Sequence, residues 1–184
     1  ERGMARETGG MTRLQTRDST DLAFDDENDI NNMYLTFGIG GEDYGISIAF
    51  VTEIVGMQRV MEVPDVPRFI KGVINLRGKV IPVMDVRLRF GMEEKVYTER
   101  TVIIVLDIEN IPIGLVVDNV SEVLEIPEAN IDQPPQFGSH HGGKGMIRGL
   151  GKAGDRVAIL LDIHQLVSSQ RGERAACGEP GIAA

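Results

Sequence analysis

Apolar residues along this chain occur in short runs that are separated by polar and turn-forming residues. The runs are rich in Val and Ile, and clusters of Gly, Pro, Asn and Asp lie between them. This pattern predicts β-strands, because β-branched side chains pack well on a pleated surface and the intervening residues favour turns. The predicted strands include residues 34–39, 80–84, 101–108, 113–117 and 156–161. Strands this short are typical of small β-barrels, so we expect an all-β fold.

Helical periodicity is confined to two short segments, residues 86–90 and 163–167. Each segment directly follows an aspartate, Asp85 or Asp162. An aspartate in this position can accept a hydrogen bond from a free backbone N–H in the first helical turn. We therefore expect two short helical turns, each capped by its aspartate.

A weak internal repeat runs through the strand pattern. The matching segments are Gly45-Ile46 with 51–55 (VTEIV) against Gly114-Leu115 with 120–124 (VSEVL), and 80–86 (VIPVMDV) against 157–163 (VAILLDI). Two matching pairs of segments in the same order indicate a duplicated unit, here two small barrels. A unit of about 65 to 70 residues is only marginally stable alone, so the two barrels should share an apolar interface.

Two tails flank the expected folded part. Residues 1–31 are polar and end in an acidic run, and residues 168–184 are rich in Gly, Ala and charged residues. Neither tail has enough apolar side chains to offset the entropy lost on ordering, so we expect a disordered acidic N-terminal tail and a flexible C-terminal tail. Between them we expect a first β-barrel subdomain over residues 33–98 and a second over residues 99–167.

Charge and cysteine content exclude several classes of function. Asp and Glu outnumber Lys and Arg by 28 to 19, and the formal net charge is -9, whereas nucleic-acid binding needs a surplus of positive charge. The single cysteine, Cys177, lies in the C-terminal tail and leaves no disulfide framework. No run of about 18 apolar residues is present, so we expect a cytoplasmic protein without direct membrane insertion.

Candidate catalytic and cofactor motifs are weak. His140 and His141 are adjacent in a Gly-rich loop with no third ligand in view, which argues against a metal site. Residues 138–144 fit a G-x-x-x-x-G-K pattern, but Gly145 replaces the Ser or Thr that would hold magnesium. We expect no catalytic residue, cofactor or metal. The alternative, an enzyme built on small barrels, would require a pocket with convergent titratable groups.

The most informative stretch is residues 69–91, FIKGVINLRGKVIPVMDVRLRFG. It predicts a strand, a tight turn at Arg77-Gly78, a second strand and one turn of helix. Arg77 has two interpretations. It is either a solvated turn residue or a rigidly held guanidinium that, beside Asn75, offers planar donors to carbonyl or carboxylate groups of a partner.

This stretch and its flanks resemble the CheW-like coupling proteins and the equivalent regulatory domain of the chemotaxis kinase CheA. The resemblance covers residues 33–167. The motifs that carry it are an opening strand with a G-I pair (37–48), V-x-E-I-V (51–55), V-P-x-x-P-x-F-I-x-G-V-x-N-L-R-G (63–78), V-I-P-V-x-D-φ-R (80–87), V-V-D-x-V-x-x-V (116–123) and G-L-G-x-x-G-x-R-x-x-I-L-L-D (149–162). The resemblance implies two tandem five-stranded barrels of the Src-homology-3 type, packed on a shared core.

The resemblance also implies a non-enzymatic scaffold that links the cytoplasmic tips of chemoreceptors (methyl-accepting proteins) to a CheA-type histidine kinase. The receptor tip would lie in a groove between the barrels, and the kinase regulatory domain would bind the end of the first barrel. Carried over to this sequence, the receptor-binding candidates are Gly72, Asn75, Leu76 and Arg77, and the kinase-binding candidates are Val51 and Glu53. Without the resemblance, core packing accounts for Val51 and a solvated charge accounts for Glu53.

By the same resemblance, the chain would act as a monomer incorporated into receptor arrays on the cytoplasmic side of the inner membrane. The alternative is a CheW-like adaptor of a non-flagellar chemosensory pathway, such as pilus motility or another phosphorelay. The sequence does not separate these two pathways.

Overall fold

The described chain is built almost entirely from short β-strands. The computed structural model describes residues 30–134 and 145–168. Its strands are β1 (Met33–Ile39), β2 (Glu42–Ser47), β3 (Val51–Gly56), β4 (Ile70–Leu76), β5 (Lys79–Asp85), β6 (Val102–Ile108), β7 (Ile111–Val117), β8 (Asn119–Glu125), β9 (Ile131–Asp132), β10 (Ile147–Ala153) and β11 (Arg156–Leu161). Two short helices, α2 (Val86–Arg89) and α3 (Ile163–Ser168), and two 3₁₀ turns, Ile48–Phe50 and Glu128–Asn130, complete the fold. Every predicted strand and both predicted helical turns are confirmed, with ends that differ by at most two residues.

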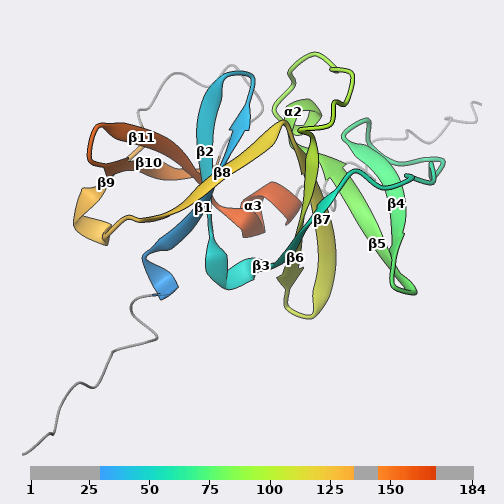
Figure 1. The fold of residues 1–184 in the computed structure, drawn as a ribbon, viewed down its shortest axis with the longest axis horizontal. Coiled ribbons are helices and arrows are strands. Elements are labelled where there is room, and N and C mark those ends of the chain that lie inside the picture. The colour runs from blue at the N-terminus through green and yellow to red at the C-terminus, as the bar shows by residue number, and fades with distance from the viewer. Residues whose placement is uncertain (1–29, 135–144, 169–184) are drawn as a thin grey trace, which may run out of the picture.

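The strands form two sheets, and each sheet curls into a small barrel (Figure 1). One sheet has the order β3-β6-β7-β5-β4 and is called here the five-strand barrel. The other has the order β8-β1-β2-β11-β10-β9 and is called the six-strand barrel. In the five-strand barrel, Met61, which follows β3, forms a bridge to Val73 of β4 at the far edge of the sheet. The expected all-β fold of two small barrels is confirmed, although one sheet carries the additional two-residue strand β9.

Each barrel contains a hairpin from the other half of the chain. β1 and β2 pair with β8 and β11 in the six-strand barrel, whereas β6 and β7 pair with β3 and β5 in the five-strand barrel. The chain crosses between the barrels at the 3₁₀ turn Ile48–Phe50 and again at Asp118, between β7 and β8. The sheets therefore divide the strands differently from the expected subdomains 33–98 and 99–167.

The glycines of the internal repeat lie where two strands approach closely. Gly45 of β2 is the parallel partner of Leu160 of β11, and Gly114 of β7 is the parallel partner of Val83 of β5. A Cβ atom at Gly45 would lie 2.8 Å from a methyl carbon of Leu160, and one at Gly114 would lie 2.8 Å from a methyl carbon of Ile103. The repeated G-φ motif thus marks the contact at which an exchanged hairpin joins its barrel.

A shared apolar core holds the two barrels together. Its buried residues come from both sheets and from both short helices, and include Leu35, Phe37, Met84, Val86, Leu106, Leu161, Ile163 and Leu166. Tyr44 of the six-strand barrel stacks on Phe90, which follows α2, with ring centroids 5.3 Å apart. Figure 1 shows α3 between the two barrels. The apolar interface expected from the size of the repeat is therefore present.

Both expected helix caps are confirmed. The Asp85 carboxylate accepts a hydrogen bond from the backbone N–H of Leu88 at 3.2 Å, and the Asp162 carboxylate accepts one from Gln165 at 3.1 Å. Asp85 is buried, and its second oxygen accepts a hydrogen bond from the Tyr97 hydroxyl at 2.8 Å. Burial, together with this carboxylate, raises the pKa of Tyr97 well above its ordinary value. The folded protein therefore favours the protonated phenol.

We predict that the contribution of Tyr97 to stability is lost in strong alkali. Because the pKa of Tyr97 is raised on folding, its contribution is complete below the unfolded pKa of about 10 and declines as pH rises towards the folded value. Urea unfolding from pH 8 to pH 11.5 should show a steeper loss of unfolding free energy in the wild type than in Tyr97→Phe. Equal slopes for the two proteins would contradict the assignment.

Candidate functional site

The hairpin between β4 and β5 holds three of the four receptor-binding candidates near its tip. Leu76 pairs with Lys79, so Arg77 and Gly78 form a two-residue turn in which φ is 52° and 84°. Two positive φ angles are typical of a type I′ turn, which matches the twist of the flanking strands. The Asn75 side chain accepts a hydrogen bond from the Gly78 backbone N–H at 2.9 Å. The backbone that carries Arg77 is therefore held firmly.

Arg77 forms a bidentate ion pair with Glu53 of β3. Its Nη1 donates to Glu53 Oε1 at 3.1 Å, and its Nη2 donates to Glu53 Oε2 at 2.5 Å. The planar fork of a guanidinium matches the two oxygens of a carboxylate, so this geometry fixes the orientation of both side chains. The structure thus joins a receptor-binding candidate directly to a kinase-binding candidate.

The ion pair is accessible from solvent on its Arg77 side. The Arg77 side chain is 72% exposed, whereas that of Glu53 is 28% exposed. The hydrogen bonds that Arg77 donates to Glu53 raise the pKa of Arg77, so its guanidinium stays charged. Exposed ion pairs contribute little net stability, so this pair can open without endangering the fold.

Side chains that the sequence analysis did not single out surround the hairpin. A shallow hollow of about 320 Å³ is lined by Gln58, Arg59, Met61 and Asn75. Met61 is 50% exposed there. The first three residues lie in the irregular segment between β3 and β4, where neither a strand period nor a turn motif indicates which side chains face outward. Their sequence carries no signal that would have identified them.

An exposed valine extends this surface along the hairpin. Val80 of β5 is directly opposite Asn75 of β4, so both side chains lie on the same face of the sheet. Val80 is 60% exposed. The next pair inward, Ile74 and Ile81, is buried in the five-strand barrel. We call the surface formed by Glu53, Met61, Asn75, Arg77 and Val80 the hairpin face.

Leu76 and Val51 pack against buried side chains. Leu76 is partly buried against the core of the five-strand barrel, which contains Ile74 and Val105. Val51 is partly buried against the shared core and pairs with Leu106 of β6. Both residues support the positions of their neighbours on the hairpin face.

Gly72 is buried at a β-bulge in β4, where its φ is 136°. A Cβ atom at this position would lie only 2.0 Å from the backbone carbonyl oxygen of Met61. Glycine is therefore required for the close approach between β4 and the segment after β3. This segment carries Met61, so Gly72 allows Met61 to take its position in the hairpin face.

The six-strand barrel also carries an ion pair at the glutamate position of the repeat. Glu122 occupies the position in the repeat that Glu53 occupies in β3, and it pairs with Arg156 at the start of β11. Arg156 also contacts Asp43 of β2 at 3.2 Å. In this barrel the arginine bridges two carboxylates, whereas Arg77 contacts Glu53.

A second pocket among the described residues is small. A narrow pocket beside Asp85, Tyr97 and Thr101 has a volume of about 20 Å³, which accommodates one water molecule. Within residues 30–134 and 145–168, no three His, Cys, Asp or Glu side chains are placed to hold a metal ion, and no helix is long and apolar enough to cross a membrane. His140, His141, the glycine-rich pattern at 138–144 and Cys177 lie outside the described residues.

Comparisons with known proteins agree on one family. The family model described as CheW-like domain matches residues 33–171. A Chemotaxis protein CheW from Klebsiella aerogenes is 40% identical over 141 residues, covering 77% of this chain and 84% of that protein. One from Treponema pallidum is 31% identical over 153 residues, covering 81% and 89%. The crystal structure of the scaffolding protein TtCheW from Thermoanaerobacter tengcongensis matches with a TM-score of 0.67 and 34% identity, covering 74% of this chain and 92% of that one.

We predict that Gly72→Ala strongly destabilises the protein. The added methyl group would clash with backbone atoms and would occupy an unfavourable φ, for a loss of about 3 kcal/mol or more of unfolding free energy. Gly56→Ala in β3 is the matched control, because a Cβ atom there meets no heavy atom within 4 Å. Urea unfolding should show a large drop for the first variant and a small change for the second. Similar stabilities would contradict the role assigned to Gly72.

Proposed function

Because the chain belongs to the CheW-like domain family, we propose that it is a non-enzymatic coupling protein that links the cytoplasmic tips of chemoreceptors to a CheA-type histidine kinase. In this proposal it resides on the cytoplasmic side of receptor arrays, and its partners are the receptor tip and the kinase regulatory domain. Its similarity to proteins named as chemotaxis and scaffolding proteins supports a structural role in chemotaxis signalling.

The observation that carries the proposal furthest is the ion pair between Arg77 and Glu53. The resemblance implies Arg77 as a receptor-binding candidate and Glu53 as a kinase-binding candidate, and the two side chains are hydrogen-bonded to each other. A change at one of them therefore reaches the other without any rearrangement of the barrel. This arrangement supports a direct electrostatic link between the two proposed binding surfaces.

The proposed link works by exchange of hydrogen-bond partners. A receptor tip that presents a carboxylate or a helix C-terminal carbonyl would compete with Glu53 for the exposed guanidinium of Arg77. When Arg77 turns to the receptor, Glu53 loses its partner and offers its charge to the kinase domain. The backbone of the type I′ turn stays fixed, so only the side chains move.

Apolar side chains on the hairpin face supply contact area. Val80 and Met61 are exposed there beside the ion pair. A specific interface typically buries about 800 Å² per partner, so the hairpin face would form part of each contact. Weak individual contacts become effective in an array, because many copies engage at the same time. No chemical turnover is required for this role.

We predict that single substitutions at the ion pair separate the two binding activities. The wild type should retain a receptor cytoplasmic fragment and a kinase regulatory domain together in a co-purification. Arg77→Ala should lose about tenfold or more in receptor affinity, because charge-assisted bidentate contacts contribute to recognition. Glu53→Ala should weaken mainly the kinase contact. Binding isotherms with each purified partner measure both effects.

Arg148→Ala is the matched control for this experiment. Arg148 is also an arginine paired with a single glutamate, Glu128 at 2.9 Å, but it lies in the six-strand barrel. Its removal should leave both affinities unchanged. If the wild type binds neither partner, the proposed function is wrong; if Arg77→Ala and Arg148→Ala behave alike, the assignment of Arg77 is wrong.

A further inference from the structure

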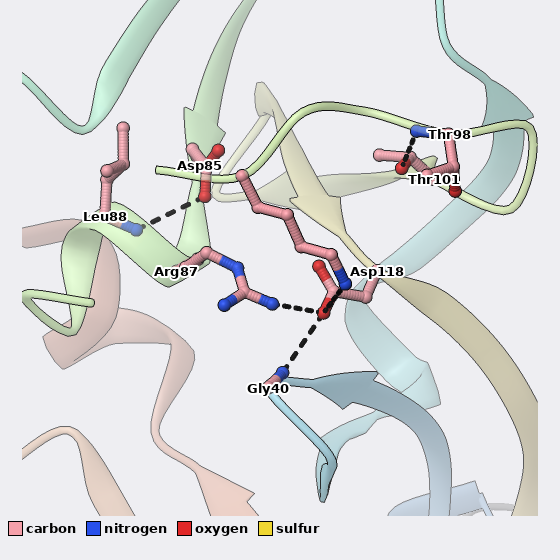
Figure 2. Close-up of polar contacts among 8 residues, drawn as sticks. Gly40, Asp85, Arg87, Leu88, Thr98, Thr101 and Asp118 are labelled. Atoms are coloured by element: carbon pink, nitrogen blue, oxygen red, sulfur yellow. Dashed lines mark hydrogen bonds and ion pairs between the residues drawn. The ribbon is translucent and has the colours of Figure 1, made fainter. Parts of the chain in front are cut away.

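Asp118 lies at the point where the chain passes from one barrel to the other. It is the single residue between β7 of the five-strand barrel and β8 of the six-strand barrel. Its backbone N–H donates to the carbonyl oxygen of Gly38 in β1 at 3.1 Å. Its side chain contacts three further parts of the fold, as Figure 2 shows for Gly40 and Arg87.

One carboxylate oxygen of Asp118 receives donors from both barrels. Arg87 of α2, which follows β5, forms a charged hydrogen bond to it, and Lys95 of the loop after α2 lies 3.8 Å away. The backbone N–H of Gly40, in the turn between β1 and β2 of the six-strand barrel, donates to the same oxygen at 3.1 Å. The side chains of Arg87 and Asp118 are only 15% and 25% exposed. Partial exclusion of water strengthens these interactions relative to those of a surface pair.

The surrounding packing holds the turn between β1 and β2 against α2. A Cβ atom at Gly40 would lie 3.6 Å from the sulfur of Met92 and 3.9 Å from Nη1 of Arg87, so the glycine lies close to both side chains. The last pair between β1 and β8, Gly38 with Asn119, lies next to the contact of Asp118 with Gly40. Asp118 therefore connects a turn, a helix and a crossover that belong to different barrels.

In the other crossover between the barrels, the residue equivalent to Asp118 cannot form such an ion pair. The repeat aligns Asp118 with Ala49, in the first crossover between the barrels, and Arg87 with His164 of α3. There the contact is aromatic, because the ring of His164 lies edge-on to Phe50 with centroids 5.4 Å apart. The two crossovers are thus built differently, because one has a central carboxylate and the other an aromatic contact.

From these contacts we propose that Asp118 is a positioning residue that fixes the orientation of the two barrels and thereby transmits receptor state to the kinase. The second half of this inference rests on the function proposed above. The shared apolar core keeps the barrels together but is not directional, whereas the hydrogen bonds to Asp118 specify one arrangement. Without the negative charge, Arg87 and Lys95 lose the group that orients them, and the barrels can reorient about their core.

The first test measures the orientation of the barrels directly. Spin labels are placed in the full chain at Lys79→Cys and Asp155→Cys, one on an exposed hairpin of each barrel, with Cys177→Ser to remove the native thiol. Pulsed electron-electron double resonance then measures the distance between the two labels in the parent protein and in Asp118→Asn. This substitution keeps an acceptor for the Gly40 N–H but removes the charge. We expect a narrow distance distribution in the parent and a broadened or shifted one in the variant. An unchanged distribution would overturn the proposal.

Asp107→Asn is the matched control, because Asp107 accepts a hydrogen bond from the backbone of Asn110 in a turn within the five-strand barrel. Its distance distribution should equal that of the parent, and a change as large as that of Asp118→Asn would count against a specific role for Asp118. Circular dichroism verifies that each variant is folded. If Asp118→Asn fails to fold, Lys95→Gln replaces it, because this variant removes the more distant cation of the same cluster. Lys95→Gln should broaden the distance distribution to a smaller extent. An unchanged distance distribution would overturn the proposal.

The second test asks whether the orientation matters for coupling. Asp118→Asn should still bind the receptor fragment and the kinase domain separately, while receptor-dependent kinase activation falls by about tenfold. Unchanged activation with a broadened distance distribution would overturn the transmitting role. If the wild type itself gives no receptor-dependent activation, the proposed function fails, whereas the distance measurement still decides the positioning role of Asp118.

Discussion

A shared apolar core stabilises both barrels. Barrels of about 65 residues bury too little surface to be more than marginally stable alone, and each fully buried Leu, Ile or Phe contributes about 1.5–3 kcal/mol. Side chains from both sheets, together with Val86 of α2 and Ile163 of α3, fill one common interior. The exchanged hairpins bring this about, because each half of the chain supplies strands to both barrels. The two barrels consequently fold as one unit.

The hairpin face lies on the five-strand barrel, which serves as its frame. A coupling protein without chemistry of its own needs a frame that does not deform and a few side chains that can change partners. The type I′ turn supplies the frame, and the bidentate pair between Arg77 and Glu53 supplies the exchangeable contact. The contacts of Asp118, by contrast, connect the two barrels to each other. The first feature concerns side chains at one edge, and the second concerns the arrangement of the two barrels.

The sequence predicted the elements well because their determinants are local. Strand periodicity, the turn at Arg77-Gly78 and the caps at Asp85 and Asp162 depend on neighbouring residues. The exchange of hairpins could not be predicted, because β1 and β6 have similar apolar patterns and strand partners depend on contacts between residues far apart in the sequence. The same holds for the pair of Glu53 and Arg77, which are 24 positions apart and were assigned to separate partners. Gln58, Arg59 and Met61 were missed because irregular segments carry no periodic signal.

The most direct test of this account is to measure the affinity of the receptor fragment by titration calorimetry, with and without a saturating concentration of the kinase regulatory domain. If the two binding surfaces are linked through Arg77 and Glu53, each partner must change the affinity for the other by the same factor. We expect such a reciprocal change in the wild type and its loss in the double variant Glu53→Ala, Arg77→Ala. Identical receptor affinities in the presence and absence of the kinase domain would contradict it.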